Sequence, residues 1–129
     1  MREKITAALI MTVHLLVVLG HGKAHSQLRI QPKIWQGTFI AVVIVIGPVL
    51  ATALLWTRLR RIGFVLLSST MAGSLVFGVA YHFFVPGSDN ALELQSGHWE
   101  SLFRTTALWL AVIEAGAIAW CGWALKGDV

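Results

Sequence analysis

The sequence contains little charge for its length. Only 12% of its 129 residues are charged, against about 25% in a typical soluble domain, while 57% are hydrophobic. So few charged side chains cannot cover the surface of a soluble globule of this size. A soluble enzyme domain, a disordered chain and a nucleic-acid-binding module are therefore excluded, and the composition indicates an integral membrane protein.

Cysteine and catalytic motifs are also scarce. The single cysteine, Cys121, excludes an intrachain disulfide and a zinc site built from several thiolates. The chain has no glycine-rich phosphate-binding loop, no H-E-x-x-H and no G-x-S-x-G. An ATPase, a protease or a hydrolase would need such residues, so the sequence favours a protein that is not an enzyme.

Four apolar segments are long enough to cross a membrane, which takes about 20 mostly apolar residues. They cover approximately residues 5–25, 34–56, 62–85 and 101–125. Together they account for most of the chain. We therefore predict an all-α fold with one domain, residues 1–129, that forms an integral membrane bundle of four transmembrane helices.

Two features are expected to shape the packing of these helices. Pro48 lies near the middle of the second segment, where it removes one backbone N–H, so we expect a kink there. The fourth segment carries a small residue at every fourth position, and small residues let helices approach closely in lipid. These residues are Ala107, Ala111, Ala115 and Ala119.

The net charge of +4 is explained by cationic residues that flank the apolar helices. The basic turn at residues 58–61 predicts that both termini are cytoplasmic, in the plasma (inner) membrane. The expected partner is the lipid bilayer, with a homo-oligomer or a larger membrane complex as further options and no nucleic acid. Residues 1–26 also resemble a cleaved secretory signal. We favour a retained helix because the apolar stretch is long for a signal and His14 interrupts it.

The histidines are the first candidates for function, because polar groups inside a bilayer are costly. His14, His21 and His25 fall within an arc of about 40° on one face of the first helix. His82 ends the third helix and His98 precedes the fourth, so four of the five histidines are expected near the outer face. We therefore predict an outward-facing site formed by His21, His25, His82 and His98.

The histidine site suits several ligands. Imidazoles bind copper, iron and zinc, and two of them on facing helices at equal depth also suit haem b. Carboxylates of the outer loop would add harder ligands, and the candidates are Asp89, Glu93 and Glu100. The residue types leave the choice between these cofactors open. The alternative is that these histidines are ordinary interfacial residues solvated by water and lipid headgroups.

Glu114 is the one charged residue that falls well inside a predicted span. His14 lies at a similar depth, about 15 Å from the cytoplasmic side, so the two predict an intramembrane polar pair. Such a pair serves either as a proton relay or ion-coupling site, or as a structural hydrogen bond that fixes helix order.

Three functions follow from these residues. The first is a membrane protein with an outward-facing histidine site for a transition metal or haem. The second is a structural or accessory subunit of a larger membrane complex with no ligand of its own. The third is a small oligomeric proton-coupled carrier that uses Glu114.

Overall fold

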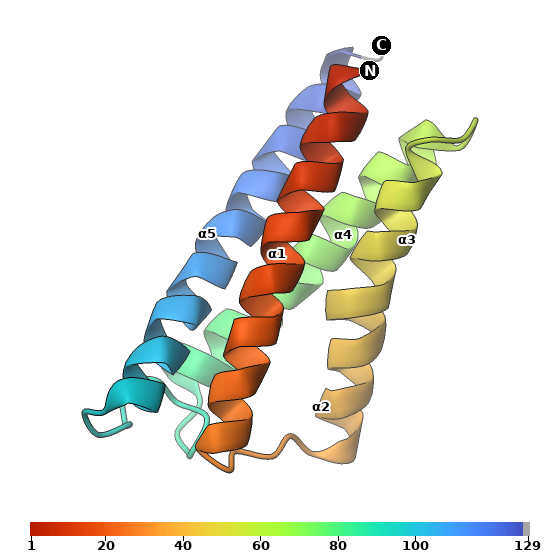
Figure 1. The fold of residues 1–129 in the computed structure, drawn as a ribbon. Coiled ribbons are helices and arrows are strands. Elements are labelled where there is room, and N and C mark those ends of the chain that lie inside the picture. Colours follow the sequence, from red (N-terminus) through yellow and green to blue (C-terminus); the bar gives the residue numbers. More distant parts are fainter. Residues whose placement is uncertain (128–129) are drawn as a thin grey trace.

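In the computed structural model, which describes residues 1–127, the chain forms a bundle of long helices (Figure 1). No strand is present among these residues. The elements are α1 (Arg2–Gln27), α2 (Ile34–Phe39), η1 (Ile40–Ile46), α3 (Gly47–Leu54), α4 (Arg60–Val79), η2 (Ala80–Phe84) and α5 (His98–Gly127). The η segments are π-helical and continue the neighbouring α-helices without a break.

Four helical stretches are long and apolar enough to cross a membrane. They are Arg2–Gln27, Ile34–Leu54, Arg60–Phe84 and His98–Gly127. The prediction of an all-helical chain with four membrane-length helices is therefore confirmed. The first and last stretches are longer than predicted because the helix continues into the polar residues that flank the apolar segment.

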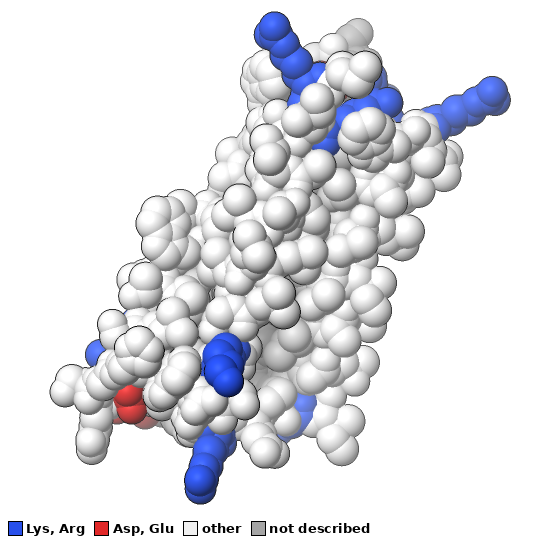
Figure 2. All heavy atoms as spheres, viewed as in Figure 1, with Lys and Arg blue, Asp and Glu red and all other residues white. Residues whose placement is uncertain are grey.

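The two ends of the bundle differ (Figure 1). The start of α1, the end of α5 and the turn between α3 and α4 lie at one end, which we call the terminal end. The connections 28–33 and 85–97 lie at the opposite end, the histidine end. At the terminal end, Glu3 and Arg60 form an ion pair at 3.6 Å. Figure 2 shows Lys and Arg gathered at both ends and an uncharged face between them, as expected for a membrane-spanning bundle.

The second span changes helix type in its middle. The π-helical segment η1 ends directly before α3, whose first turn contains Pro48. Because Pro48 has no N–H to donate, it is tolerated at the start of a new helical segment. The N–H of Gly47 bonds to the carbonyl of Val42, five residues back. The helix thus accommodates Pro48 by the π-helical segment that precedes it.

The buried face of α5 differs from the predicted alanine stripe. Ala107 is buried, but Ala115 and Ala119 are exposed, so the prediction is wrong for these two residues. Residues at every fourth position drift by about 40° per step around an α-helix, which carries the stripe off the interface. The buried residues of α5 are Phe103, Thr106, Ala107, Glu114, Ala117, Cys121 and Ala124.

The apolar core is divided into two parts. The larger cluster lies toward the terminal end, and its buried members are Ala7, Met11, Ala51, Leu55, Phe64, Leu67, Met71, Ala117, Cys121 and Ala124. The smaller cluster lies at the histidine end and contains Ala24, Ala91 and Phe103. Between these two clusters the helices bury polar side chains and enclose a cavity, and this is where the candidate site lies.

Gly63 allows α3 and α4 to pack at backbone distance. A Cβ atom there would lie 2.9 Å from the carbonyl oxygen of Ala51 and 2.8 Å from Cδ2 of Leu55. The carbonyl oxygen of Ala51 belongs to the backbone, so it can move away from an added Cβ atom only if the whole of α3 shifts. We therefore expect Gly63→Ala to destabilise the protein by roughly 1–3 kcal/mol. Gly116→Ala is the control, since a Cβ atom there meets nothing within 4 Å. Thermal unfolding in detergent measures both, and equal melting temperatures would contradict this close packing.

Candidate metal centre

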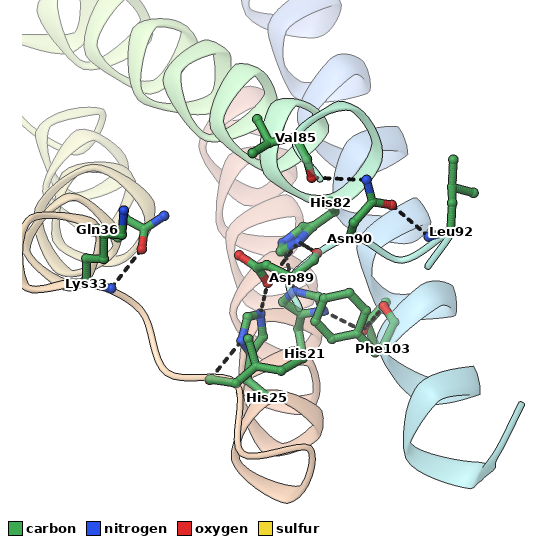
Figure 3. A network of polar contacts seen from close by, with 12 residues as sticks. His21, His25, Lys33, Gln36, His82, Val85, Asp89, Asn90, Leu92 and Phe103 are labelled. Carbon is green, nitrogen blue, oxygen red and sulfur yellow. Dashed lines mark hydrogen bonds and ion pairs between the residues drawn. The ribbon is translucent and has the colours of Figure 1, made fainter. Parts of the chain in front are cut away.

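Three histidines from two spans meet at the histidine end (Figure 3). His21 and His25 lie one turn apart on α1, and His82 lies on η2. One ring nitrogen from each lies within 4.8 Å of the others, and the Nε2 atoms of His21 and His82 are 3.1 Å apart. We call these three residues the triad. Residues far apart in sequence thus form one cluster of imidazoles.

The end of the third span directs His82 into the triad. His82 is buried in the π-helical segment η2, and the following loop folds back over it. The carbonyl of Asp89 accepts a hydrogen bond from Nδ1 of His82 at 3.0 Å. The N–H of Ala91 donates to the backbone carbonyl of His82 at 2.7 Å. The loop therefore fixes both the backbone and the ring of His82.

Two side chains hold the loop 85–97 in this position. Asn90 donates to the carbonyl of Val85 at 3.0 Å and accepts a hydrogen bond from the N–H of Leu92 at 2.9 Å (Figure 3). From α5, the guanidinium of Arg104 donates to three loop carbonyls, those of Ala91, Leu94 and Gln95. The loop is thereby tied to α5 as well as to η2.

Phe103 of α5 supports the three imidazoles from one side. This residue is fully buried. Its ring centroid lies 4.7 Å from that of His21, 4.9 Å from that of His25 and 5.0 Å from that of His82. Aromatic rings at such distances pack favourably. Phe103 therefore holds the imidazoles together and keeps solvent away from that side of the cluster.

Thr106 determines which nitrogen of His21 carries the proton. Its Oγ1 lies 2.8 Å from Nδ1 of His21. The Thr106 hydroxyl has one proton, which it donates to the carbonyl of Leu102 at 2.7 Å. The oxygen of Thr106 therefore accepts the N–H of His21 Nδ1. In the neutral ring this leaves Nε2 of His21 with an unshared lone pair.

The other two histidines also have acceptors beside their rings. Nδ1 of His82 faces the carbonyl of Asp89, and Nδ1 of His25 faces the carbonyl of Ile30 at 3.4 Å. A carbonyl only accepts hydrogen bonds, so Nδ1 of His82 carries a proton. In a neutral ring, Nε2 of His82 is then unprotonated. Nε2 of His25 lies 3.4 Å from a carboxylate oxygen of Asp89, so the contacts of His25 fit a proton on either ring nitrogen.

The Nε2 atoms of the triad face one another and Asp89. Nε2 of His21 faces Nε2 of His82, and Nε2 of His25 lies 3.4 Å from Oδ1 of Asp89. That carboxylate oxygen is buried and also lies 3.3 Å from Nδ1 of His82, so two imidazoles contact it, although neither contact has hydrogen-bond geometry. In neutral rings, the lone pairs of Nε2 of His21 and Nε2 of His82 therefore face each other with no proton between them. A cation between these two atoms, either a metal ion or an additional proton, would stabilise the contact.

The other residues predicted for the site lie elsewhere. His98 is exposed at the start of α5, where its ring contacts that of Trp99, and it does not belong to the triad. Glu93 is exposed, and Glu100 is half-buried at the start of α5. Of the three predicted loop carboxylates, the structure brings Asp89 to the triad.

A second polar cluster lies deeper in the bundle. His14 of α1 and Glu114 of α5 are both buried, and Nε2 of His14 lies 3.2 Å from Oε1 of Glu114. Ser74 of α4 donates a hydrogen bond to the same oxygen. Nδ1 of His14 has no hydrogen-bond partner within residues 1–127. The structure thus brings the predicted pair together and adds Ser74, so that the contact joins three helices.

A cavity of about 700 Å³ connects the two polar clusters. The triad and Asp89 line one end of this cavity, and Ser74 and Glu114 line the other. The wall between the ends is largely apolar and includes Val18, Ile40, Ile44, Leu75, Ala107, Leu110 and Ala111. Cavities that bind small molecules in proteins have volumes of about 300–1,000 Å³ and similar linings.

Comparisons with known proteins give no match for this chain. No family model matches it, and neither does any curated protein or any solved structure. Its function is therefore inferred from the geometry of the site.

The residues that orient the triad were not indicated by the sequence. Phe103 and Thr106 lie in an apolar segment without a motif. Arg104 lies near the start of that segment, where basic residues commonly flank a membrane span. The one available indication was the polar Thr105-Thr106 pair inside the fourth apolar span. The helix order of the bundle turns that pair into a hydrogen-bond partner for His21.

Proposed function

We propose that this multi-pass membrane protein binds one divalent transition-metal ion through the triad. The observation that carries the proposal is the meeting of one ring nitrogen from each of three imidazoles within 4.8 Å, beside the carboxylate of Asp89. Histidines that bind metals almost always donate their second ring N–H to a carbonyl, a carboxylate or water, which fixes the tautomer. Each imidazole of the triad has such an acceptor at Nδ1.

The spacing of the nitrogens supports a small ion. Zinc binds imidazole nitrogen at about 2.0–2.1 Å, so two nitrogens on a tetrahedral ion lie about 3.3 Å apart. The distance between Nε2 of His21 and Nε2 of His82 is 3.1 Å. A nitrogen of His25 within 4.8 Å reaches the same ion after a small rotation of its side chain.

The same geometry argues against haem b at the triad. Two axial histidines bind to opposite faces of a porphyrin, so the macrocycle must fit between their rings. The ring centroids of His21 and His82 are 4.8 Å apart, and their Nε2 atoms are in contact. No porphyrin plane fits into that space, which leaves a single metal ion as the ligand.

The donor atoms favour copper(II), zinc or iron(II). Imidazoles and a carboxylate suit these ions, and the general order of affinities predicts the tightest binding for Cu²⁺. The buried sulfur-containing residues Met11, Met71 and Cys121 lie in the core cluster toward the terminal end. The triad therefore lacks the soft ligands that select Cu⁺.

The proposed centre is open on one side. The triad and Asp89 all line the cavity, so the remaining coordination positions of the metal face that space. Structural zinc sites are closed by four protein ligands, whereas reactive or exchanging sites keep a position free. With both termini cytoplasmic, as the basic turn predicts, the metal enters from the outer face.

The carrier and accessory-subunit alternatives remain predictions from the sequence.

Titration of the metal-free protein with Co²⁺ in detergent tests this proposal. We expect saturation at one equivalent, visible absorption bands of a four- or five-coordinate ion, and displacement by Zn²⁺. The triple variant His21→Ala/His25→Ala/His82→Ala should show none of these. Absence of saturable binding, or equal binding by the triple variant, would show that the triad holds no metal.

Thr106→Val tests the hydrogen bond that orients His21. The substitution keeps the shape of the side chain but removes the acceptor for His21 Nδ1–H. Loss of such an orienting partner lowers metal affinity by about 10–100-fold, and we expect this for Co²⁺. Thr106→Ser retains the hydroxyl and serves as the control. Competition with a chelator of known affinity measures both, and equal affinities in the two variants would contradict the role of this hydroxyl.

A further inference from the structure

The cavity is far larger than a metal ion requires. Its volume is about 700 Å³, whereas one water molecule occupies about 30 Å³ in the liquid. A metal ion with a few waters at the triad therefore leaves most of the space unfilled. Because the wall beyond the triad is largely apolar, water gains few hydrogen bonds there. Size and lining fit an organic molecule.

The cavity lies between α1 and the second span. Val18 of α1 lines it on one side, Ile40 and Ile44 of η1 line it on the other, and Leu75 and Leu110 form its back wall. Figure 1 shows that α1 and the second span diverge toward the histidine end. In a membrane-spanning bundle this side of the cavity faces the bilayer. A lipid-soluble molecule therefore has a short route into it.

Glu114 gives the inner end of the cavity a hydrogen-bond acceptor. His14 and Ser74, the two residues that contact its carboxyl group, both do so at Oε1. No hydrogen bond joins Oε2 to another residue in 1–127, and this oxygen is accessible from the cavity although the side chain of Glu114 is only 3% exposed. An acceptor that faces a largely apolar cavity and no protein donor depends on the contents of the cavity for a hydrogen bond. A ligand that supplies a donor at this position provides that bond.

The charges around the cavity and its place inside the membrane favour a neutral ligand. Arg29 and Asp89 both line the opposite end, beside the triad, so their charges oppose each other there. An anionic headgroup is repelled by Glu114, and a cationic amine would have to bring its charge into the interior of the membrane, which is costly. A hydroxyl group donates to Oε2 without bringing a charge into the membrane.

We infer that the cavity binds a neutral, lipid-soluble alcohol or phenol. Its hydroxyl group donates to Oε2 of Glu114, and its apolar body lies along Val18, Ile44 and Leu110. This inference goes beyond metal binding and does not depend on it, because Glu114 is not part of the triad.

Two probes that differ only in the donor test the inference. They are 4-decylphenol and its methyl ether, 4-decylanisole, each added to the full-length, zinc-loaded protein in detergent. Native mass spectrometry counts bound probe, and the melting temperature reports its affinity. We expect one 4-decylphenol per chain, bound about 10–100-fold more tightly than the ether, as for a hydrogen bond to a charged acceptor. Equal affinities would show that the cavity accepts apolar chains without recognising a hydroxyl group.

Substitutions locate the bound probe. Ala111 lines the cavity, so Ala111→Phe should abolish binding of both probes. Ala115 lies one turn further along α5 and is exposed, so Ala115→Phe is the matched control and should bind like the original protein. Glu114→Gln removes the charged acceptor and should reduce the preference for the phenol to less than about threefold. Unchanged binding by Ala111→Phe, or an unchanged preference in Glu114→Gln, would overturn the inference.

Metal content is measured on the same samples and separates the two proposals. One zinc ion per chain in Ala111→Phe and Glu114→Gln shows that these variants fold with an intact triad, so that their loss of phenol binding reflects the cavity. Selective phenol binding by a protein that holds no zinc would contradict the metal centre and support the cavity site.

Discussion

His82→Ala is expected to lower the affinity for Co²⁺ roughly a hundredfold to a thousandfold. Zinc sites with four protein ligands bind with about 10–16 kcal/mol, or roughly 2.5–4 kcal/mol for each ligand, which corresponds approximately to this range. The loss should be close to the full value of one ligand. His82 is buried, and no other histidine is placed to replace it in the triad.

His98→Ala is the matched control for this experiment. His98 is exposed and contacts the ring of Trp99, so its removal should leave the Co²⁺ affinity unchanged. Chelator competition at fixed pH measures both variants. If His98→Ala weakened binding as much as His82→Ala, the ligands would be the four histidines predicted from the sequence, and the triad would be incomplete.

Glu114→Leu is expected to lower the free energy of unfolding by about 2–4 kcal/mol. The substitution leaves His14 with no partner on either ring nitrogen, since Nδ1 already lacks one, and it removes the acceptor of Ser74. An average polar contact between membrane helices contributes only about 0.6 kcal/mol. A loss of unfolding free energy well above that average would come from leaving the buried imidazole of His14 without a hydrogen-bond partner, rather than from losing the contact itself.

A double substitution separates these two contributions. In His14→Leu/Glu114→Leu both partners are apolar, and Ser74 can donate to a carbonyl of its own helix, so most of the lost stability should return. Reversible unfolding in mixed detergent micelles measures the single and double variants. A double variant less stable than Glu114→Leu, or a Glu114→Leu protein as stable as the original chain, would contradict the proposed role of this contact.

The arrangement of spans and the depth of the polar groups follow from the sequence alone. Membrane helices need long apolar segments, and this chain has four. A fixed rotation of 100° per residue places His14, His21 and His25 on one face of α1. A fixed rise per residue places Glu114 at the depth of His14, where the structure pairs them. These are local properties, so they need no knowledge of the neighbouring helices.

The faces by which the helices pack could not be predicted in the same way. In lipid, the outward and inward faces of a helix are both apolar, so hydropathy does not distinguish them. The alanine stripe therefore pointed to the wrong face beyond Ala111, and the roles of Phe103 and Thr106 were invisible. The position of His98 depended on the path of the 85–97 loop, which Asn90 and Arg104 determine through backbone carbonyls.

X-ray absorption spectroscopy of the zinc-loaded protein tests the central claim most directly. We predict a coordination shell of nitrogen and oxygen atoms only, at about 2.0–2.2 Å, with the multiple-scattering pattern of three imidazoles. A shell with one imidazole or none, or with sulfur at about 2.3 Å, would contradict binding by His21, His25 and His82.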